Sequence, residues 1–127
     1  MNNCQLGEME QRFAELIWAH APVASGELVR LCAEAFAWKK STTYTMLHRL
    51  CERGIFENRE GTVHTVLTRE AWLSMQSEAF VEETFSGSLP RFLSAFASRK
   101  ALNEEEVAAL EQMIAEYRNS ERKGKKE

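Results

Sequence analysis

The clearest chemical signal in this 127-residue sequence is a run of hydrogen-bonding and cationic side chains between residues 39 and 49. The run consists of Lys39, Lys40, Ser41, Thr42, Tyr44, Thr45, His48 and Arg49. Most of these residues fall on the side of a helical wheel opposite the apolar positions Thr43, Met46, Leu47, Leu50 and Cys51. Hydroxyl and guanidinium groups on one side of a helix can hydrogen-bond base edges and contact phosphates. We therefore predict that a helix of about residues 41–53 enters the major groove of double-stranded DNA.

Two further candidate DNA-binding residues lie on a predicted β-hairpin that follows this helix. Residues 55–59 and 62–67 are rich in β-prone side chains, and Glu60-Gly61 between them offers glycine where a tight turn needs positive φ. Arg59 precedes the turn and His64 lies on the second strand. A hairpin in this position forms a wing that lies along the DNA backbone, so Arg59 and His64 complete the predicted interface.

The elements before the hairpin must hold the DNA-binding helix in place. Apolar residues recur at steps of three and four from Leu6 to about His20, which predicts a first helix that Pro22 ends. Ser25 is the expected N-cap of a second helix over about residues 26–36, and Gly54 ends the third helix. A short strand at Val23 is expected to pair with the hairpin. We predict a mainly α fold with a small β-hairpin, in which residues 1–69 form a winged helix-turn-helix DNA-binding domain.

The remaining residues, 70–127, have helical composition but no evident core of their own. Helical patterns cover about residues 68–85 and 89–97, and a last helix begins at Asn103 and runs into a charged tail from Ser120. Their narrow apolar stripes need another surface, and a second copy of the chain is the simplest one. We predict that this region forms a homodimer through Phe80, Phe85, Leu89, Phe92, Phe96, Val107, Leu110 and Ile114.

The charge distribution agrees with this division. The whole chain has a formal net charge of −3, which by itself argues against a nucleic-acid partner. Residues 37–69, however, carry six basic and three acidic side chains, whereas residues 70–127 carry eight basic and eleven acidic ones. The positive charge therefore lies on the predicted DNA-binding helix and hairpin.

Several other classes of function are disfavoured by what the sequence lacks. The chain contains no Asp, its three histidines are scattered, and it has no glycine-rich phosphate loop or nucleophile elbow. The three cysteines, Cys4, Cys32 and Cys51, match no zinc spacing and suit reduced thiols. Without an apolar span or a signal-peptide pattern, we expect a cytoplasmic protein that is not an enzyme and has no cofactor and no metal site.

The segment from Trp38 to Gly54, WKKSTTYTMLHRLCERG, resembles the recognition-helix signature of the BlaI/MecI/CopY (penicillinase repressor) family. The opening from Leu6 to Trp18 is similar to the first helix of that family, and the resemblance covers nearly the whole chain. It implies a homodimeric repressor of resistance or stress genes that binds a pseudo-palindromic operator. Thr42, Thr45 and Arg49 match the positions that contact DNA in the family, whereas Tyr44 replaces what is often Arg or Lys and so changes the expected target sequence.

The resemblance also suggests how repression could be relieved. In the β-lactam branch of the family, a membrane sensor protease pathway leads to cleavage of the repressor at an Asn-Phe bond. The matching pair in this chain is Ala95-Phe96, which retains only the second residue. In the copper branch a C-terminal cysteine motif binds metal, but this chain has no cysteine after Cys51. Proteolytic release at Ala95-Phe96 is therefore a hypothesis, and metal sensing by that route is not expected.

Two other interpretations of the residues stay open. A winged helix can serve as a protein-interaction module, with its basic segment merely solvated. Alternatively, the chain could be a ligand-sensing regulator with an aromatic pocket formed by Trp72, Phe80, Phe92 and Phe96. Salt dependence of DNA affinity separates the first interpretation from DNA binding.

Overall fold

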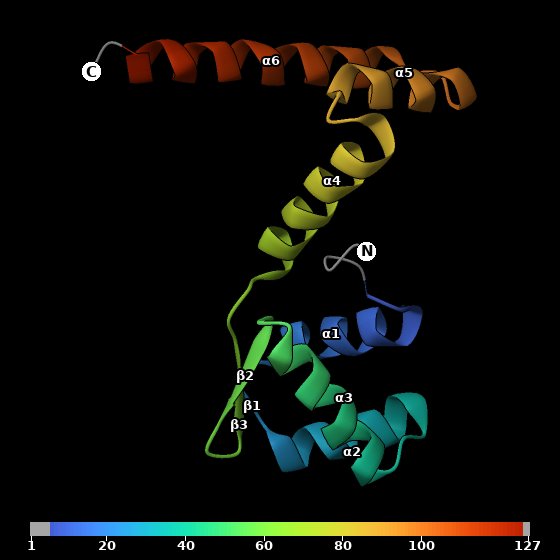
Figure 1. The fold of residues 1–127 in the computed structure, drawn as a ribbon, viewed down its shortest axis with the longest axis vertical. Coiled ribbons are helices and arrows are strands. Elements are labelled where there is room, and N and C mark those ends of the chain that lie inside the picture. Colours follow the sequence, from blue (N-terminus) through green and yellow to red (C-terminus); the bar gives the residue numbers. More distant parts are fainter. Residues whose placement is uncertain (1–5, 126–127) are drawn as a thin grey trace. The chain divides into compact units, whose positions relative to one another are not determined.

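The computed structural model describes residues 6–125, with side chains as far as Arg122, and contains six helices and a three-stranded sheet within that range (Figure 1). The chain divides into two units between Thr84 and Phe85. The first unit contains, in order, α1 (Glu8–His20), β1 (Val23–Ala24), α2 (Ser25–Phe36), α3 (Lys40–Glu52), β2 (Phe56–Arg59), β3 (Thr62–Thr65) and α4 (Arg69–Phe85) to its last residue but one. The second contains α5 (Leu89–Arg99) and α6 (Glu104–Lys125). The predicted winged helix followed by C-terminal helices is confirmed.

The small sheet joins the hairpin to the start of the chain. Its strand order is β1-β3-β2 and both pairings are antiparallel, with Val23 opposite Val63 and Phe56 opposite Thr65. The hairpin turns at Glu60 and Gly61, whose φ values of 50° and 87° are both positive, as a tight two-residue hairpin turn requires. The predicted turn and the predicted pairing of Val23 with the hairpin are both confirmed.

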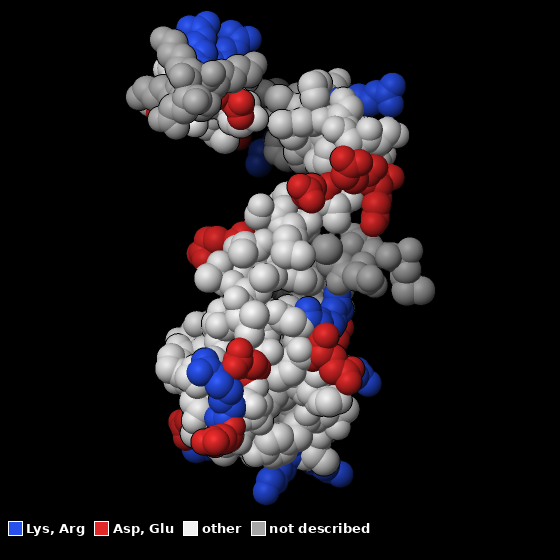
Figure 2. Space-filling view, turned by 60° about the vertical axis from the view of Figure 1, so that its left-hand side comes forward, with Lys and Arg blue, Asp and Glu red and all other residues white. Residues whose placement is uncertain are grey.

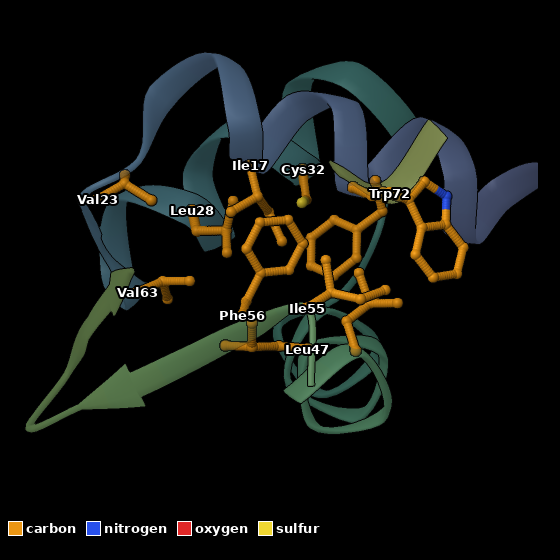
Figure 3. Packing of buried hydrophobic residues seen from close by; sticks show 12 residues of the cluster. Ile17, Val23, Leu28, Cys32, Leu47, Ile55, Phe56, Val63 and Trp72 are labelled. Atoms are coloured by element: carbon orange, nitrogen blue, oxygen red, sulfur yellow. The ribbon is translucent and has the colours of Figure 1, made fainter. Parts of the chain in front are cut away.

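Side chains from α1, α2, α3, the sheet and the start of α4 meet in one core (Figure 3). Ile17 of α1, Leu28 of α2 and Leu50 of α3 are fully buried, as are Ile55 before the hairpin and Val63 within it. Each buried side chain of this size contributes about 1.5–3 kcal/mol through removal of apolar surface from water. Cys32 is fully buried in this core and Cys51 packs against it, and burial raises the pKa of both thiols.

The first turns of α4 are part of this unit. Trp72 is only 2% exposed and lies at one end of the core in Figure 3. Two residues shortly before Trp72 bond to α1: the Leu67 carbonyl accepts from the Trp18 Nε1–H at 2.9 Å, and the Arg69 Nε–H donates to Glu15 Oε1 at 2.6 Å. The sequence offered no reason to place Trp72 in this core, and the functional boundary between residues 69 and 70 stays a prediction.

Three local expectations differ from the structure. Ser25 is the first residue of α2 and Ala24 is the N-cap, so the predicted N-cap at Ser25 is wrong. The strands are shorter than predicted, because Ile55 precedes β2 and β3 ends at Thr65. The predicted frayed tail from Ser120 is helical as far as Lys125, while Cys4, Lys126 and Glu127 lie outside the described residues.

The second unit is held by helix caps and by contacts between aromatic rings. Ser88 Oγ accepts from the Arg91 N–H at 3.2 Å, and Asn103 and Glu106 exchange side-chain and backbone hydrogen bonds at 2.8 and 3.0 Å. The Phe92 ring lies 5.7 Å from that of Phe85. Yet none of the described side chains from residue 85 to residue 122 is fully buried.

No helix within residues 6–125 is long and apolar enough to cross a membrane.

Candidate nucleic-acid interface

The rotation of α3 about its axis is set by its buried side. Thr43, Leu47 and Leu50 are at most 2% exposed and pack into the core. The buried Thr43 hydroxyl donates to the Lys39 carbonyl at 3.4 Å, because a buried polar group requires a partner. Because three positions on one side of α3 are fixed in this way, the opposite side must face solvent.

A short turn connects α2 to α3 and orients the second helix. Ala37 adopts a left-handed conformation with φ 58° and ψ 34°, which ends α2, and only residues 37–39 separate the two helices. Trp38 within this turn packs on Phe13 and Phe36, with ring centroids 5.2 and 4.9 Å apart. Two helices joined by a packed turn of this length form a helix-turn-helix, of which α3 is the second helix.

All the candidate residues predicted between positions 39 and 49 are exposed, as the helical wheel requires. Two of them contact neighbours on the same helix. The His48 Nε2 lies 2.9 Å from Glu52 Oε1, although both side chains are mostly exposed, and the Arg49 guanidinium lies 3.7 Å from the Met46 sulfur. These are local, solvent-accessible contacts that DNA groups can replace. The exposed side of α3 therefore offers three hydroxyl residues, Ser41, Thr42 and Thr45, together with cations at both ends.

Tyr44 differs from its neighbours on α3 because its hydroxyl has a partner on another helix. It donates to Ser25 Oγ at the start of α2 at 3.0 Å, and the Tyr44 side chain is 36% exposed. Sequence reasoning placed Tyr44 on the DNA-binding side but missed this contact. No signal in the sequence could have indicated it, because the two residues are 19 positions apart and belong to separate helices.

The hairpin presents the two remaining candidates. Arg59 is exposed on β2, and its Nε lies 2.5 Å from Glu57 Oε1. His64 is half-buried on β3, directly opposite Glu57 in the antiparallel register. The hairpin turn is tied to the start of α2, since the Ser25 N–H donates to the Gly61 carbonyl at 2.8 Å. The fold thus brings α3 and the hairpin into one unit, but Arg59 and His64 both lie near an acidic side chain.

Basic side chains of this unit differ in whether an acidic one lies beside them. On the face that Figure 2 presents, blue and red side chains adjoin over the middle of the first unit, while blue side chains alone protrude at its lower end. Lys39 and Lys40 stand at the N-terminal end of α3, where the exposed helix start also favours anions. Cations available to phosphates therefore lie at the ends of α3 and along the wing.

The structure also places the residues predicted for dimerisation and for ligand sensing. Phe80, Leu89, Phe96 and Ile114 are 43–62% exposed, while Phe85, Phe92, Val107 and Leu110 are partly buried. Phe92 and Phe96 line an open apolar groove together with residues of α6, and neither Trp72 nor Phe80 lines it. Ala95 and Phe96 are both exposed within α5. Among the described side chains, no cluster of three potential metal ligands occurs.

Comparison with known proteins identifies relatives of the whole chain. A family model described as "Penicillinase repressor" matches residues 6–116, which include both units. A curated protein named "Penicillinase repressor" from Bacillus licheniformis is 24% identical over 119 residues, covering 91% of this chain and 93% of that protein. The matched region includes α3, the hairpin, and the helices α4 and α5, with most of α6.

Proposed function

This chain belongs to the penicillinase repressor family, and from that premise we propose that it represses transcription as a homodimer bound to a pseudo-palindromic operator. Members of the family are DNA-binding transcriptional regulators and not enzymes. In the proposed complex each copy places α3 in the major groove of one half-site and lays the hairpin along the neighbouring backbone. The regulated genes would be resistance or stress genes, as the family's name suggests.

One observation carries the DNA-contacting part of this proposal: the side of α3 opposite the core is an exposed row of hydroxyls flanked by cations. Thr42 and Thr45 would hydrogen-bond base edges or phosphates. Arg49, Lys39 and Lys40 would contact phosphates, as would Arg59 from the wing. Ser41, His48 and His64 complete the proposed contacts, and Tyr44 lies at the edge of the interface.

The need for a second copy follows from the exposed apolar side chains of the C-terminal helices. A helix pair without a fully buried side chain cannot supply the apolar burial on which folding depends. A second copy related by two-fold symmetry would cover the exposed side chains of both chains at once. The proposed contact residues are those predicted from the sequence: Phe80, Phe85, Leu89, Phe92, Phe96, Val107, Leu110 and Ile114.

Loss of the dimer would relieve repression. Two linked DNA-binding units bind two half-sites with a large effective concentration, which a single unit forfeits. Cleavage at Ala95-Phe96 by a membrane sensor protease pathway would have this effect, because it would separate α6 from the DNA-binding unit. The exposure of both residues supports access, although α5 would have to open locally before a protease could bind its backbone.

The test is a titration of full-length protein on promoter DNA at several salt concentrations. We expect an affinity that falls steeply with salt. Arg49→Ala should weaken binding by roughly tenfold to a hundredfold, because a charge-assisted hydrogen bond contributes about 1.5–3 kcal/mol, and should reduce the salt slope by about one. Arg118→Ala, which removes an exposed guanidinium from α6, is the matched control. A DNA affinity that does not change with salt concentration, or that is too weak to measure at low salt, would refute the proposed DNA binding.

A further inference from the structure

A continuous path of hydrogen bonds runs from the recognition helix to the turn of the wing. The Tyr44 hydroxyl donates to Ser25 Oγ at 3.0 Å, and the Ser25 N–H donates to the Gly61 carbonyl at 2.8 Å. The Gly61 N–H in turn donates to Asn58 Oδ1 at 3.0 Å. Ser25, the first residue of α2, therefore bridges α3 and the hairpin turn.

The position of Tyr44 on α3 agrees with a role toward the hairpin. Tyr44, Leu47, His48, Cys51 and Asn58 line an open groove between α3 and β2. Tyr44 thus lies at the edge of the exposed side of α3 that faces the wing, rather than at its centre. Its hydroxyl is bonded to Ser25 Oγ on the neighbouring helix, at 3.0 Å.

The hairpin turn itself is exposed and has few contacts with α3. Phe56 and Val63 anchor the hairpin in the core, and β1 pairs with β3 as far as Thr62, but all four residues from Asn58 to Gly61 are exposed. An exposed turn with few contacts to α3 can shift relative to that helix. The bonds through Ser25 act at the turn itself, where a shift would displace Arg59 most.

We propose that Tyr44 is a positioning residue for DNA binding: through Ser25 it holds the wing at a fixed distance from the recognition helix, and its hydroxyl does not read a base. This inference rests on the proposed DNA-binding function. DNA fixes the distance between the groove that α3 enters and the backbone that the wing contacts. A protein with that distance already set loses less conformational freedom when it binds.

The test uses full-length chains with Tyr44→Phe, Ser25→Ala or both substitutions, and a duplex that the wild-type protein has selected from a random library. Ser25→Ala removes the accepting hydroxyl and keeps the N–H that bonds Gly61. Tyr117→Phe makes the same chemical change at the chain's other tyrosine, which is 68% exposed on α6, and serves as the control. The measurements are the Kd, the hydroxyl-radical footprint and the melting temperature of each variant.

Each single substitution should weaken binding by roughly threefold to tenfold, the range that one hydrogen bond provides. The double variant should bind DNA no more weakly than the weaker-binding single variant, because each single substitution already removes the same hydrogen bond. In the footprints of these three variants, the DNA protected by the wing should become more accessible to cleavage, while the DNA protected by the recognition helix stays protected. Tyr117→Phe should match the wild type. A general loss of folding would lower the melting temperature and weaken both parts of the footprint together.

Three results would overturn the positioning role. Losses that multiply in the double variant would mean that the two hydroxyls act separately on DNA. A loss in Tyr44→Phe with full affinity in Ser25→Ala would mean that the tyrosine contacts DNA directly. Wild-type affinity and footprint in every variant would mean that the bond has no role in binding. A wild-type protein that selects no duplex would instead refute the proposed function itself, and the positioning role with it.

Discussion

The two units of this chain use similar apolar side chains in opposite ways. In the first unit Phe13, Phe56 and Ile55 are at most 1% exposed, whereas in the second Phe96, Leu89 and Ile114 are 43–62% exposed. The first unit therefore has a core of its own, and the second has apolar residues but no interior among its described side chains. The difference indicates that the first unit folds by itself and that the second is shaped for a partner.

The largest effect is expected from deleting one aromatic ring in each unit. Phe56→Ala should lower the free energy of unfolding of the first unit by about 3–5 kcal/mol, because it leaves a cavity in a filled core. Phe96→Ala removes the same ring from an exposed position of the second unit. It should leave the first unit's free energy of unfolding unchanged and alter only how the second unit's unfolding depends on protein concentration. Denaturant unfolding at two protein concentrations measures both effects. Equal losses of unfolding free energy in the two variants would contradict the difference between the two units.

A charge on the exposed stripe of α6 should act on assembly alone. Ile114 is 56% exposed, so a glutamate in its place remains in water in the monomer. In the proposed dimer, Ile114→Glu would bury a carboxylate between the two copies, which is costly. We expect the dimer dissociation constant in sedimentation to rise at least tenfold, with the first unit's melting temperature unchanged. Glu111→Gln on the same helix is the control. An unchanged dissociation constant would place the dimer contact elsewhere.

A smaller effect is expected on base preference. Thr45 is exposed on the side of α3 that we propose faces DNA, and Thr45→Ala removes one hydroxyl without changing charge. A lost contact to a base edge costs about 1–3 kcal/mol and should relax selectivity at one position of each half-site. Selection from a random duplex library measures this relaxation. If Thr45→Ala selects the wild-type sequence with full affinity, the wrong side of α3 has been assigned.

The smallest effect concerns the ion pair that fastens α4 to α1. The hydrogen bond from Arg69 lowers the pKa of Glu15 below its ordinary value, so the pair stabilises the first unit above the unfolded-state pKa near 4.5. This contribution is lost as pH falls through the lower folded-state pKa. Since the pair is exposed to water, Glu15→Gln should lower the melting temperature at pH 7 by at most a few degrees.

The difference in melting temperature between Glu15→Gln and the wild type should vanish at acid pH. Glu78→Gln on the exposed side of α4 is the control. Melting curves between pH 7 and pH 3 follow the difference, and a constant gap over that range would contradict the assigned role of the pair.

Periodicity and turn chemistry were enough to predict the winged helix and the exposed side of α3. The spacing of Thr43, Leu47 and Leu50 indicates which side is buried, and Gly61 supplies the positive φ of the hairpin turn. These signals are local, since they depend on neighbours along one helix or one turn. They predict an element and its orientation without any knowledge of what packs against it.

Contacts between distant elements could not be predicted in this way. Ser25 has the residue type of an N-cap, but α2 starts one residue earlier than predicted and the Ser25 hydroxyl accepts from Tyr44 instead. Trp72 has the spacing of any apolar helical residue, yet it is buried in the first unit's core. Both outcomes depend on how helices meet in space, which a single sequence does not encode in any local pattern.

The central claim, that only the second unit depends on a second copy, is tested most directly by amide hydrogen exchange of the full chain at concentrations above and below its dimer dissociation constant. We predict that the amides of α5 and α6 lose protection on dilution, while those of α1, α2 and α3 keep it. Protection of α5 and α6 that does not change with concentration would contradict the account, as would a loss of protection in both units together.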